Sequence, residues 1–167
     1  FFDTETGSDF MIPMFQARGV PLLVLKSRSF KDLVDVVDEA EKECYGLIVD
    51  CVSHVWTELM ESYKRKLNRR AGLQFQDWGE VKGVWRGFTD RFINSQLHMV
   101  VCGRAAWVYE EGRDEETGKK TITKTGTKMR AETEFGYEPS AFTRPSVATS
   151  FPLPNRMPCR PPSPIHP

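Results

Sequence analysis

Apolar residues follow two kinds of pattern along the 167-residue chain. Short, nearly unbroken runs bounded by turn residues predict strands. These runs fall at Phe1–Phe2, Pro21–Lys26, Tyr45–Asp50 and Leu97–Cys102. Between them, apolar residues recur at helical spacing and predict four helices, at about 9–17, 29–44, 53–70 and 76–95. Gly19 suits the end of the first helix, and Ser29 suits the N-cap of the second.

The stretch Tyr45–Ser53 contains the most informative of these runs. Its apolar residues suit a strand buried on both faces, and Asp50 follows at the carboxyl end. Open α/β sheets bind their ligands at that edge. An apolar run that ends in Asp is the Walker B pattern, in which the Asp holds the Mg²⁺ of a nucleotide. The alternative is an ordinary buried strand that ends in Asp.

The order of the elements predicts an α/β fold. Strands and helices alternate as far as Cys102, which implies a mainly parallel, doubly wound sheet with right-handed crossovers. The pattern then changes to alternating segments at Trp107–Glu111 and Lys120–Thr125, which predict a C-terminal β-hairpin. Lys128–Glu138 is mixed in character and fits neither a helix nor a strand clearly.

Proline divides the chain into two parts. Nine of the eleven prolines fall from Pro139 onward, so residues 1–139 are predicted to form the core and residues 140–167 a disordered, Pro-rich tail. A truncated or frame-shifted gene end is the alternative explanation for this abrupt change in proline content. At the other end the chain starts at Phe1, without a methionine and inside a predicted strand. We therefore expect it to be a fragment, because a buried strand at the start leaves a raw sheet edge.

Composition excludes more than it suggests. With 23 basic and 23 acidic residues, overall charge gives no case for nucleic-acid or membrane binding. No apolar run approaches the roughly 20 residues that span a bilayer. The four cysteines have no metal-ligand spacing. Cys51 and Cys102 lie in or beside predicted strands, where a reduced cysteine acts as a small apolar residue, and this favours a reducing, cytoplasmic compartment. The three histidines form no ligand set or triad and are expected to be structural or exposed.

Acidic residues follow two of the predicted strands. Asp3 and Glu5 come after the first strand and Asp50 after the third, while Gly103-Arg104 follows the last one. The carboxyl ends of parallel strands share one edge, so these side chains are expected to lie close together. Nucleotide hydrolysis needs this combination of a metal-holding carboxylate and a group that orients or deprotonates the attacking water.

On these motifs the chain resembles the RecA-like P-loop ATPases, in particular the AAA type of phages and mobile elements. Phe-Phe-Asp-Thr-Glu matches the strand that ends in that family's catalytic glutamate, and Leu-Ile-Val-Asp matches its Walker B strand. The resemblance covers roughly residues 1–139. It implies ATP and Mg²⁺ as cofactors, Glu5 as general base and Asp50 as the metal carboxylate. It also implies that Asp3 and Arg104 face the nucleotide, Arg104 at the position of a polar sensor.

The resemblance extends to partners as well. RecA-like assemblies place basic residues of one subunit against the γ-phosphate bound to the next, and Lys128 or Arg130 could do this here. A solvated basic face is the alternative for both residues. The resemblance implies a homo-oligomer that acts in DNA recombination or replication, with single-stranded DNA as a partner. A non-catalytic DNA-binding or scaffold protein on the same fold stays open; among the tryptophans, Trp107 is a modest candidate for base stacking.

One family motif is missing from this sequence. The Walker A loop, G-x-x-x-x-G-K-[ST], cradles the phosphates, and its nearest imitation is Gly112–Thr121. That segment has five residues between its glycines and Lys where Ser or Thr should hold Mg²⁺, so it is interpreted as a hairpin loop. We expect this chain alone to bind ATP poorly. A natural relative that has lost nucleotide binding is the alternative to a fragment.

Overall fold

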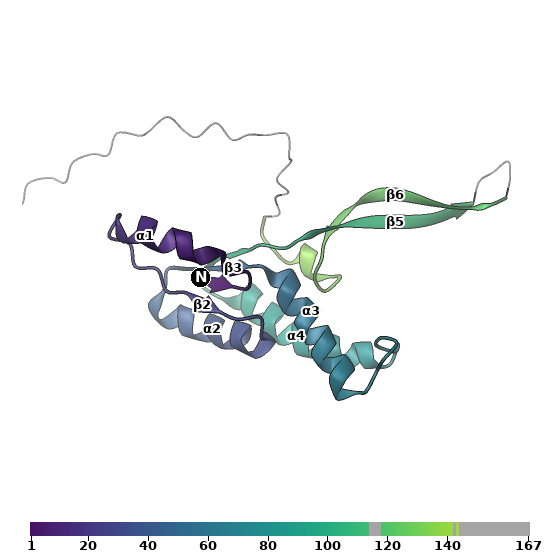
Figure 1. Ribbon diagram of the computed structural model, residues 1–167, viewed down its shortest axis with the longest axis horizontal. Helices are drawn as coiled ribbons and strands as arrows, with labels where there is room; N and C mark the ends of the chain where they lie inside the picture. Colours follow the sequence, from purple (N-terminus) through teal and green to yellow (C-terminus); the bar gives the residue numbers. More distant parts are fainter. Residues whose placement is uncertain (114–117, 142, 144–167) are drawn as a thin grey trace, which may run out of the picture.

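Four parallel strands and the helices between them make up the body of the protein (Figure 1). The structure, a computed structural model, describes residues 1–113, 118–141 and 143. The strands of the body are β1 (Phe2–Asp3), β2 (Leu25–Lys26), β3 (Gly46–Asp50) and β4 (His98–Val101). The helices are η1 (Gly7–Phe10), α1 (Met11–Gln16), α2 (Phe30–Glu43), α3 (Val52–Lys66) and α4 (Asp77–Asn94). A two-stranded sheet, β5 (Ala105–Arg113) and β6 (Lys120–Met129), and a short turn, η2 (Phe135–Tyr137), follow.

The sheet has the strand order β2-β1-β3-β4, and every neighbouring pair is parallel. The parallel α/β sheet predicted from the sequence is therefore confirmed. Asp3 lies opposite Asp50 in the register of β1 and β3, so the residues after these two strands emerge side by side. Because β1 and β3 are adjacent although a helix, a strand and another helix separate them in sequence, distant parts of the chain meet at this edge.

Burial along the strands differs from the prediction. The strand at Tyr45–Asp50 was predicted to be buried on both faces, but β3 alternates, with Leu47 and Val49 buried and Ile48 38% exposed. Both residues of β2 are exposed, because β2 is an outer strand that pairs only with β1 among the described residues. Helices α2, α3 and α4 pack against one face of the sheet, whereas α1, on the other side, buries none of its residues.

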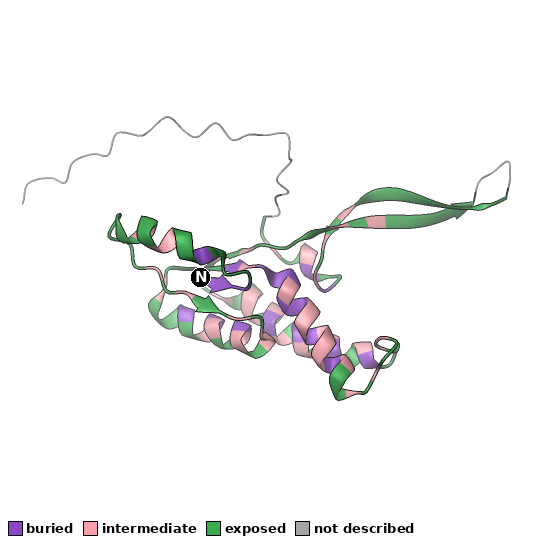
Figure 2. Cartoon of the chain, in the orientation of Figure 1, coloured by how far each residue is buried: buried purple, intermediate pink, exposed green. Residues whose placement is uncertain are grey.

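The core lies where these three helices meet the sheet (Figure 2). Helix α2 starts as predicted, with the Ser29 hydroxyl accepting a hydrogen bond from the Asp32 N–H. Trp85 of α4 is almost fully buried at the centre, with its ring centroid 5.0 Å from that of Trp56 and 5.8 Å from that of Phe135. Since Phe135 belongs to η2, the segment that follows β6 returns to the body and closes the core.

Strands β5 and β6 form an antiparallel ladder that extends away from the body as an arm (Figure 1). The ladder is longer than the alternating sequence segments, because pairing runs from Ala105 opposite Met129 to Arg113 opposite Lys120. Most of its residues are exposed. The predicted tail, beyond residue 143, and part of the Walker A imitation, residues 114–117, lie outside the described residues.

No helix in the described part of the chain combines the length and apolar character that crossing a membrane requires.

Candidate active site

The carboxyl ends of β1 and β3 bring the predicted acidic residues to one place. The Thr4 N–H donates to the Asp50 carbonyl oxygen at 2.7 Å, which continues the β1–β3 pairing past the last strand residue. The Thr4 hydroxyl accepts the Cys51 N–H at 2.8 Å and lies 2.8 Å from His54 Nδ1. Thr4 thus ties the end of β1 to the junction of β3 and α3.

Asp3 holds the turn that follows β1. Its Oδ1 accepts the Glu5 N–H at 2.9 Å, and its Oδ2 accepts both the Ser8 N–H, at 2.8 Å, and the Ser8 hydroxyl. Burial alone would raise the pKa of Asp3, but the hydrogen bonds from Ser8 and from the N–H groups of Glu5 and Gly7 lower it to about 2. Both carboxylate oxygens of Asp3 therefore accept hydrogen bonds from the turn that carries Glu5.

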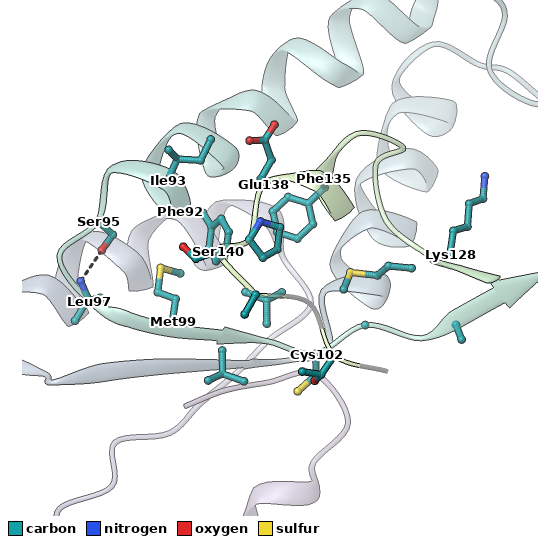
Figure 3. A pocket seen from close by; sticks show the side chains of 18 of the residues that line it. Phe92, Ile93, Ser95, Leu97, Met99, Cys102, Lys128, Phe135, Glu138 and Ser140 are labelled. Atoms are coloured by element: carbon teal, nitrogen blue, oxygen red, sulfur yellow. Dashed lines mark hydrogen bonds between the residues drawn. The ribbon is translucent and has the colours of Figure 1, made fainter. Parts of the chain in front are cut away.

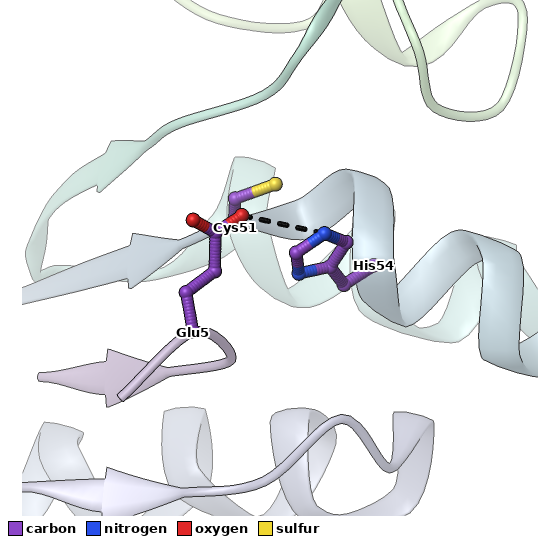
Figure 4. Close-up of side chains that lie close together, drawn as sticks. All are labelled: Glu5, Cys51 and His54. Atoms are coloured by element: carbon purple, nitrogen blue, oxygen red, sulfur yellow. Dashed lines mark ion pairs between the residues drawn. The ribbon is translucent and has the colours of Figure 1, made fainter. Parts of the chain in front are cut away.

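Glu5 projects from this turn towards two side chains that come from other elements. The Arg104 guanidinium donates to Oε1 at 2.7 Å, and His54 Nε2 lies 3.3 Å from the same oxygen (Figure 4). The Glu5 side chain remains 40% exposed. Arg104 follows β4, and its position is fixed because its N–H donates to the Ser53 hydroxyl at 2.9 Å. The sheet edge thus collects groups from β1, from the β3–α3 junction and from the end of β4.

Asp50 lies in an electrostatic environment that disfavours a bare carboxylate. Burial raises its pKa, and the negative charges of Glu5 and Asp3 raise it further, while His54 and Arg104 offset part of this effect. A cation beside Asp50 and Glu5 would relieve the same repulsion. Carboxylate oxygens are the ligands that Mg²⁺ prefers, so Asp50 and its surroundings fit the magnesium ion that the sequence resemblance implies.

His54 and Cys51 are the site residues that sequence reasoning missed. Burial lowers the pKa of His54, and the neighbouring Arg104 lowers it further, so the imidazole is neutral at pH 7. Contrary to the expectation that the histidines form no ligand set, Glu5, Cys51 and His54 bring their ligand atoms within 4.8 Å of one another. The spacing Cys-x-x-His across the start of a helix that follows a strand is the signal that could have found two of them.

The two basic candidates near the arm occupy different positions. Arg130 follows β6, and its N–H donates to the Arg104 carbonyl oxygen at 2.7 Å, so its backbone adjoins the site. Lys128 lies on β6 and lines a cavity of about 780 Å³ between the end of α4, β4 and the segment after β6 (Figure 3). The structure thus brings Glu5, Asp50 and Arg104 together, with Asp3 beneath them.

The protein is an open parallel α/β protein with carboxylates gathered at the carboxyl edge of its sheet, the edge at which proteins of this class bind their ligands. The comparison with protein families is more specific, because the model of the AAA domain family matches residues 1–137. This span is most of the chain, which therefore belongs to the AAA domain family. Membership indicates the nucleotide binding and ATPase-type function of that family. Searches of the curated proteins and of the solved structures gave no match.

Proposed function

We propose that this chain is part of the ATP-hydrolysing core of a phage-type ATPase of DNA recombination or replication, a part that lacks the Walker A loop and does not hydrolyse ATP alone. In the complete core Glu5 is the general base and Asp50 the Mg²⁺ carboxylate. The observation that carries the proposal is the convergence of Glu5, Asp50 and Arg104 at the carboxyl edge of a parallel sheet. The magnesium ion, when bound, would neutralise phosphate charge that develops during transfer.

Glu5 has the freedom and the setting that a general base needs. Its carboxylate is partly exposed, so water can reach it, while its backbone is fixed by the Asp3 carboxylate. In the structure, the Arg104 guanidinium donates a hydrogen bond to one of the two carboxylate oxygens of Glu5. A bound phosphate would compete for Arg104, because guanidinium groups bind phosphate bidentately. Moving Arg104 from Glu5 to the phosphate would free the carboxylate to accept a proton from water.

The test is the rate of ATP·Mg²⁺ hydrolysis by the protein as its gene encodes it. Glu5→Gln should lower kcat about 100-fold or more, because an amide cannot accept the proton. Asp50→Asn should raise the Mg²⁺ concentration needed for half-maximal rate. Glu41→Gln, the same change on the exposed face of α2, is the control and should leave the rate unchanged. Equal rates for the Glu5 and Glu41 variants would refute the assignment of the base.

The proposed assembly places Lys128 or Arg130 against the nucleotide of a neighbouring subunit. Mixing two inactive variants tests this directly. If Arg130 acts across the subunit interface, a mixture of Arg130→Ala and Glu5→Gln proteins regains activity, since some interfaces then combine both native residues. Lys128→Ala is tested in the same way. If ATPase activity does not recover in mixtures that size-exclusion chromatography shows to contain mixed oligomers, the residue does not act in the site of the neighbouring subunit.

The arm favours single-stranded DNA as the partner, and it equally supports the second candidate, a non-catalytic DNA-binding protein. Trp107 and Tyr109 are 56% and 54% exposed and lie on one face of β5, and the Lys124 ammonium lies 4.3 Å from the centroid of the Trp107 ring. The two strands carry three lysines and one arginine against two glutamates. Exposed aromatic rings beside basic residues suit stacked bases and phosphates.

Binding of a fluorescent oligo-deoxythymidine, followed by anisotropy, tests this partner. Trp107→Ala should weaken binding about 5-fold or more, and Lys124→Gln should reduce the salt dependence by about one phosphate contact. Tyr137→Ala, which removes an exposed ring outside the arm, is the control. An unchanged affinity for Trp107→Ala would remove the arm from the interface. DNA binding without any effect of Glu5→Gln on activity in the cell would favour the non-catalytic candidate.

A further inference from the structure

Three side chains beside the proposed catalytic edge form a cluster of a different chemical kind. Glu5 comes from the turn after β1, Cys51 from the end of β3 and His54 from the first turn of α3 (Figure 4). One carboxylate oxygen, the thiol sulfur and one imidazole nitrogen all lie within 4.8 Å of one another. In a tetrahedral zinc site such atoms are about 3.3–3.8 Å apart, as bond lengths of about 2.0–2.3 Å require. The widest separation, up to 4.8 Å, exceeds this spacing by about 1 Å, whereas Glu5 Oε1 and His54 Nε2 are already 3.3 Å apart.

The kinds of donor atom in this cluster indicate which metal ion it would bind. Thiolate and imidazole are ligands of zinc and related transition metals, whereas Mg²⁺ takes oxygen ligands and keeps several waters. One carboxylate, one thiolate and one imidazole leave a fourth position open to water. We propose that Glu5, Cys51 and His54 bind a zinc ion, at a site separate from the magnesium position assigned to Asp50.

Thr4 provides the support that a metal-binding histidine requires. Its hydroxyl oxygen lies 2.8 Å from His54 Nδ1, accepts the Cys51 N–H and lies 3.5 Å from the Cys51 carbonyl oxygen, to which it can donate. With Nδ1–H donating to Thr4, the lone pair of Nε2 faces Glu5 and the site between them. Ligating histidines are oriented by this kind of bond from the other ring nitrogen.

The exposure of the cluster to solvent and the small movement needed to close it around an ion are also compatible with metal binding. Cys51 is buried, but the partly exposed Glu5 carboxylate forms the outer wall of the cluster, so an ion can enter past it. A small adjustment of the Glu5 and Cys51 side chains would close the remaining excess, and Arg104 would then release the carboxylate oxygen that it holds. The thiol of Cys51 loses its proton to water as the sulfur–zinc bond forms. Zinc would then occupy the carboxylate assigned as the base, an inhibitory consequence that rests on the proposed ATPase function.

Binding is tested without nucleotide, so its outcome is independent of the ATPase proposal. Metal-free 167-residue chain is titrated with Co²⁺, which reports a thiolate ligand by a charge-transfer band in the near ultraviolet. We expect that band, tetrahedral bands in the visible range, and displacement of Co²⁺ by one equivalent of Zn²⁺. The absence of a thiolate band at saturating Co²⁺ would overturn the proposal.

Variants assign the ligands. Cys51→Ser should abolish the charge-transfer band, and His54→Gln should weaken Zn²⁺ binding by more than the 10- to 100-fold typical of a supporting residue. Thr4→Val removes the hydroxyl that contacts His54 Nδ1 and accepts the Cys51 N–H, and it should weaken binding within about that 10- to 100-fold range. Cys102→Ser is the matched control and should keep the band. Circular dichroism and urea unfolding verify that each variant folds; a band that survives Cys51→Ser in folded protein would refute the site.

Discussion

Asp3 should stabilise the fold through its negative charge, and Asp3→Asn tests this. The side chain is 3% exposed, and its two oxygens accept hydrogen bonds from Glu5 and Ser8. An asparagine keeps the shape but has one amide group in place of an accepting oxygen. That amide would face an N–H or hydroxyl donor of the turn, so at least one buried hydrogen bond is lost.

The size of the effect follows from the pKa of Asp3. Lowering this pKa from 3.8 to about 2 corresponds to about 2.4 kcal/mol of folding free energy, because one pKa unit is about 1.4 kcal/mol. Since the pKa of the folded state is the lower one, the contribution is complete above about pH 4–5. It is lost as the pH falls through 3.8 towards 2. Asp3→Asn should therefore cost about 2–3 kcal/mol at pH 7 and progressively less below pH 4.

Urea unfolding followed by circular dichroism, repeated between pH 7 and pH 2.5, measures both quantities. Asp9→Asn is the matched control, because Asp9 lies on η1 in the same region but is exposed and paired only with the exposed Lys26. It should cost less than about 0.5 kcal/mol at pH 7. A cost for Asp3→Asn as small as that of the control would contradict the reasoning. So would a cost that does not change between pH 7 and pH 2.5.

Two further predictions concern the packing that positions the site, and urea unfolding measures both. Phe135→Ala should lower the free energy of unfolding by about 3–5 kcal/mol, because the Phe135 ring is buried in the core. Tyr137→Ala, at an exposed ring two residues on, should lower it by less than about 0.5 kcal/mol. Equal losses for the two variants would mean that η2 does not close the core. Gly46→Ala should destabilise by about 1–3 kcal/mol, since its Cβ would lie 2.8 Å from the His98 carbonyl oxygen in β4. Gly83→Ala, inside α4 with open space around it, should instead stabilise by about 0.5–1 kcal/mol, and the same sign for both glycines would refute this account of β3–β4 pairing.

The fold was largely predictable because helices α2, α3 and α4 are long and strongly patterned. Helix α2 has an N-cap at Ser29 and an apolar face, and both features are local. Strand burial was harder to predict, since it depends on what covers each face. Leu25 and Ile48 look like core residues in the sequence, yet β2 is an outer strand and one face of β3 is covered only in part. The apolar runs therefore identified the strands, but they did not indicate which faces of each strand other elements cover.

The site was predictable only where it follows from the parallel arrangement of strands. Asp50 and Glu5 were expected at one edge because each follows a strand of the same sheet. The contact of Glu5 with His54 depends on the turn that Asp3 holds, and on Thr4 reaching across to the β3–α3 junction. No pattern within a single segment encodes such contacts. The ion pair with Arg104, 99 residues away in sequence, is of the same kind.

The Glu5 carboxylate connects the two proposals, because the roles assigned to it exclude one another. In the resting structure Arg104 holds one of its oxygens. Hydrolysis requires a carboxylate that is free to accept a proton, whereas zinc binding requires the carboxylate to turn towards Cys51 and His54. On both proposals Arg104 leaves this oxygen, so weakening the Arg104–Glu5 ion pair is expected to favour either state. Phosphate would draw Arg104 away and favour the base, and zinc would hold Glu5 in the state that cannot act as one.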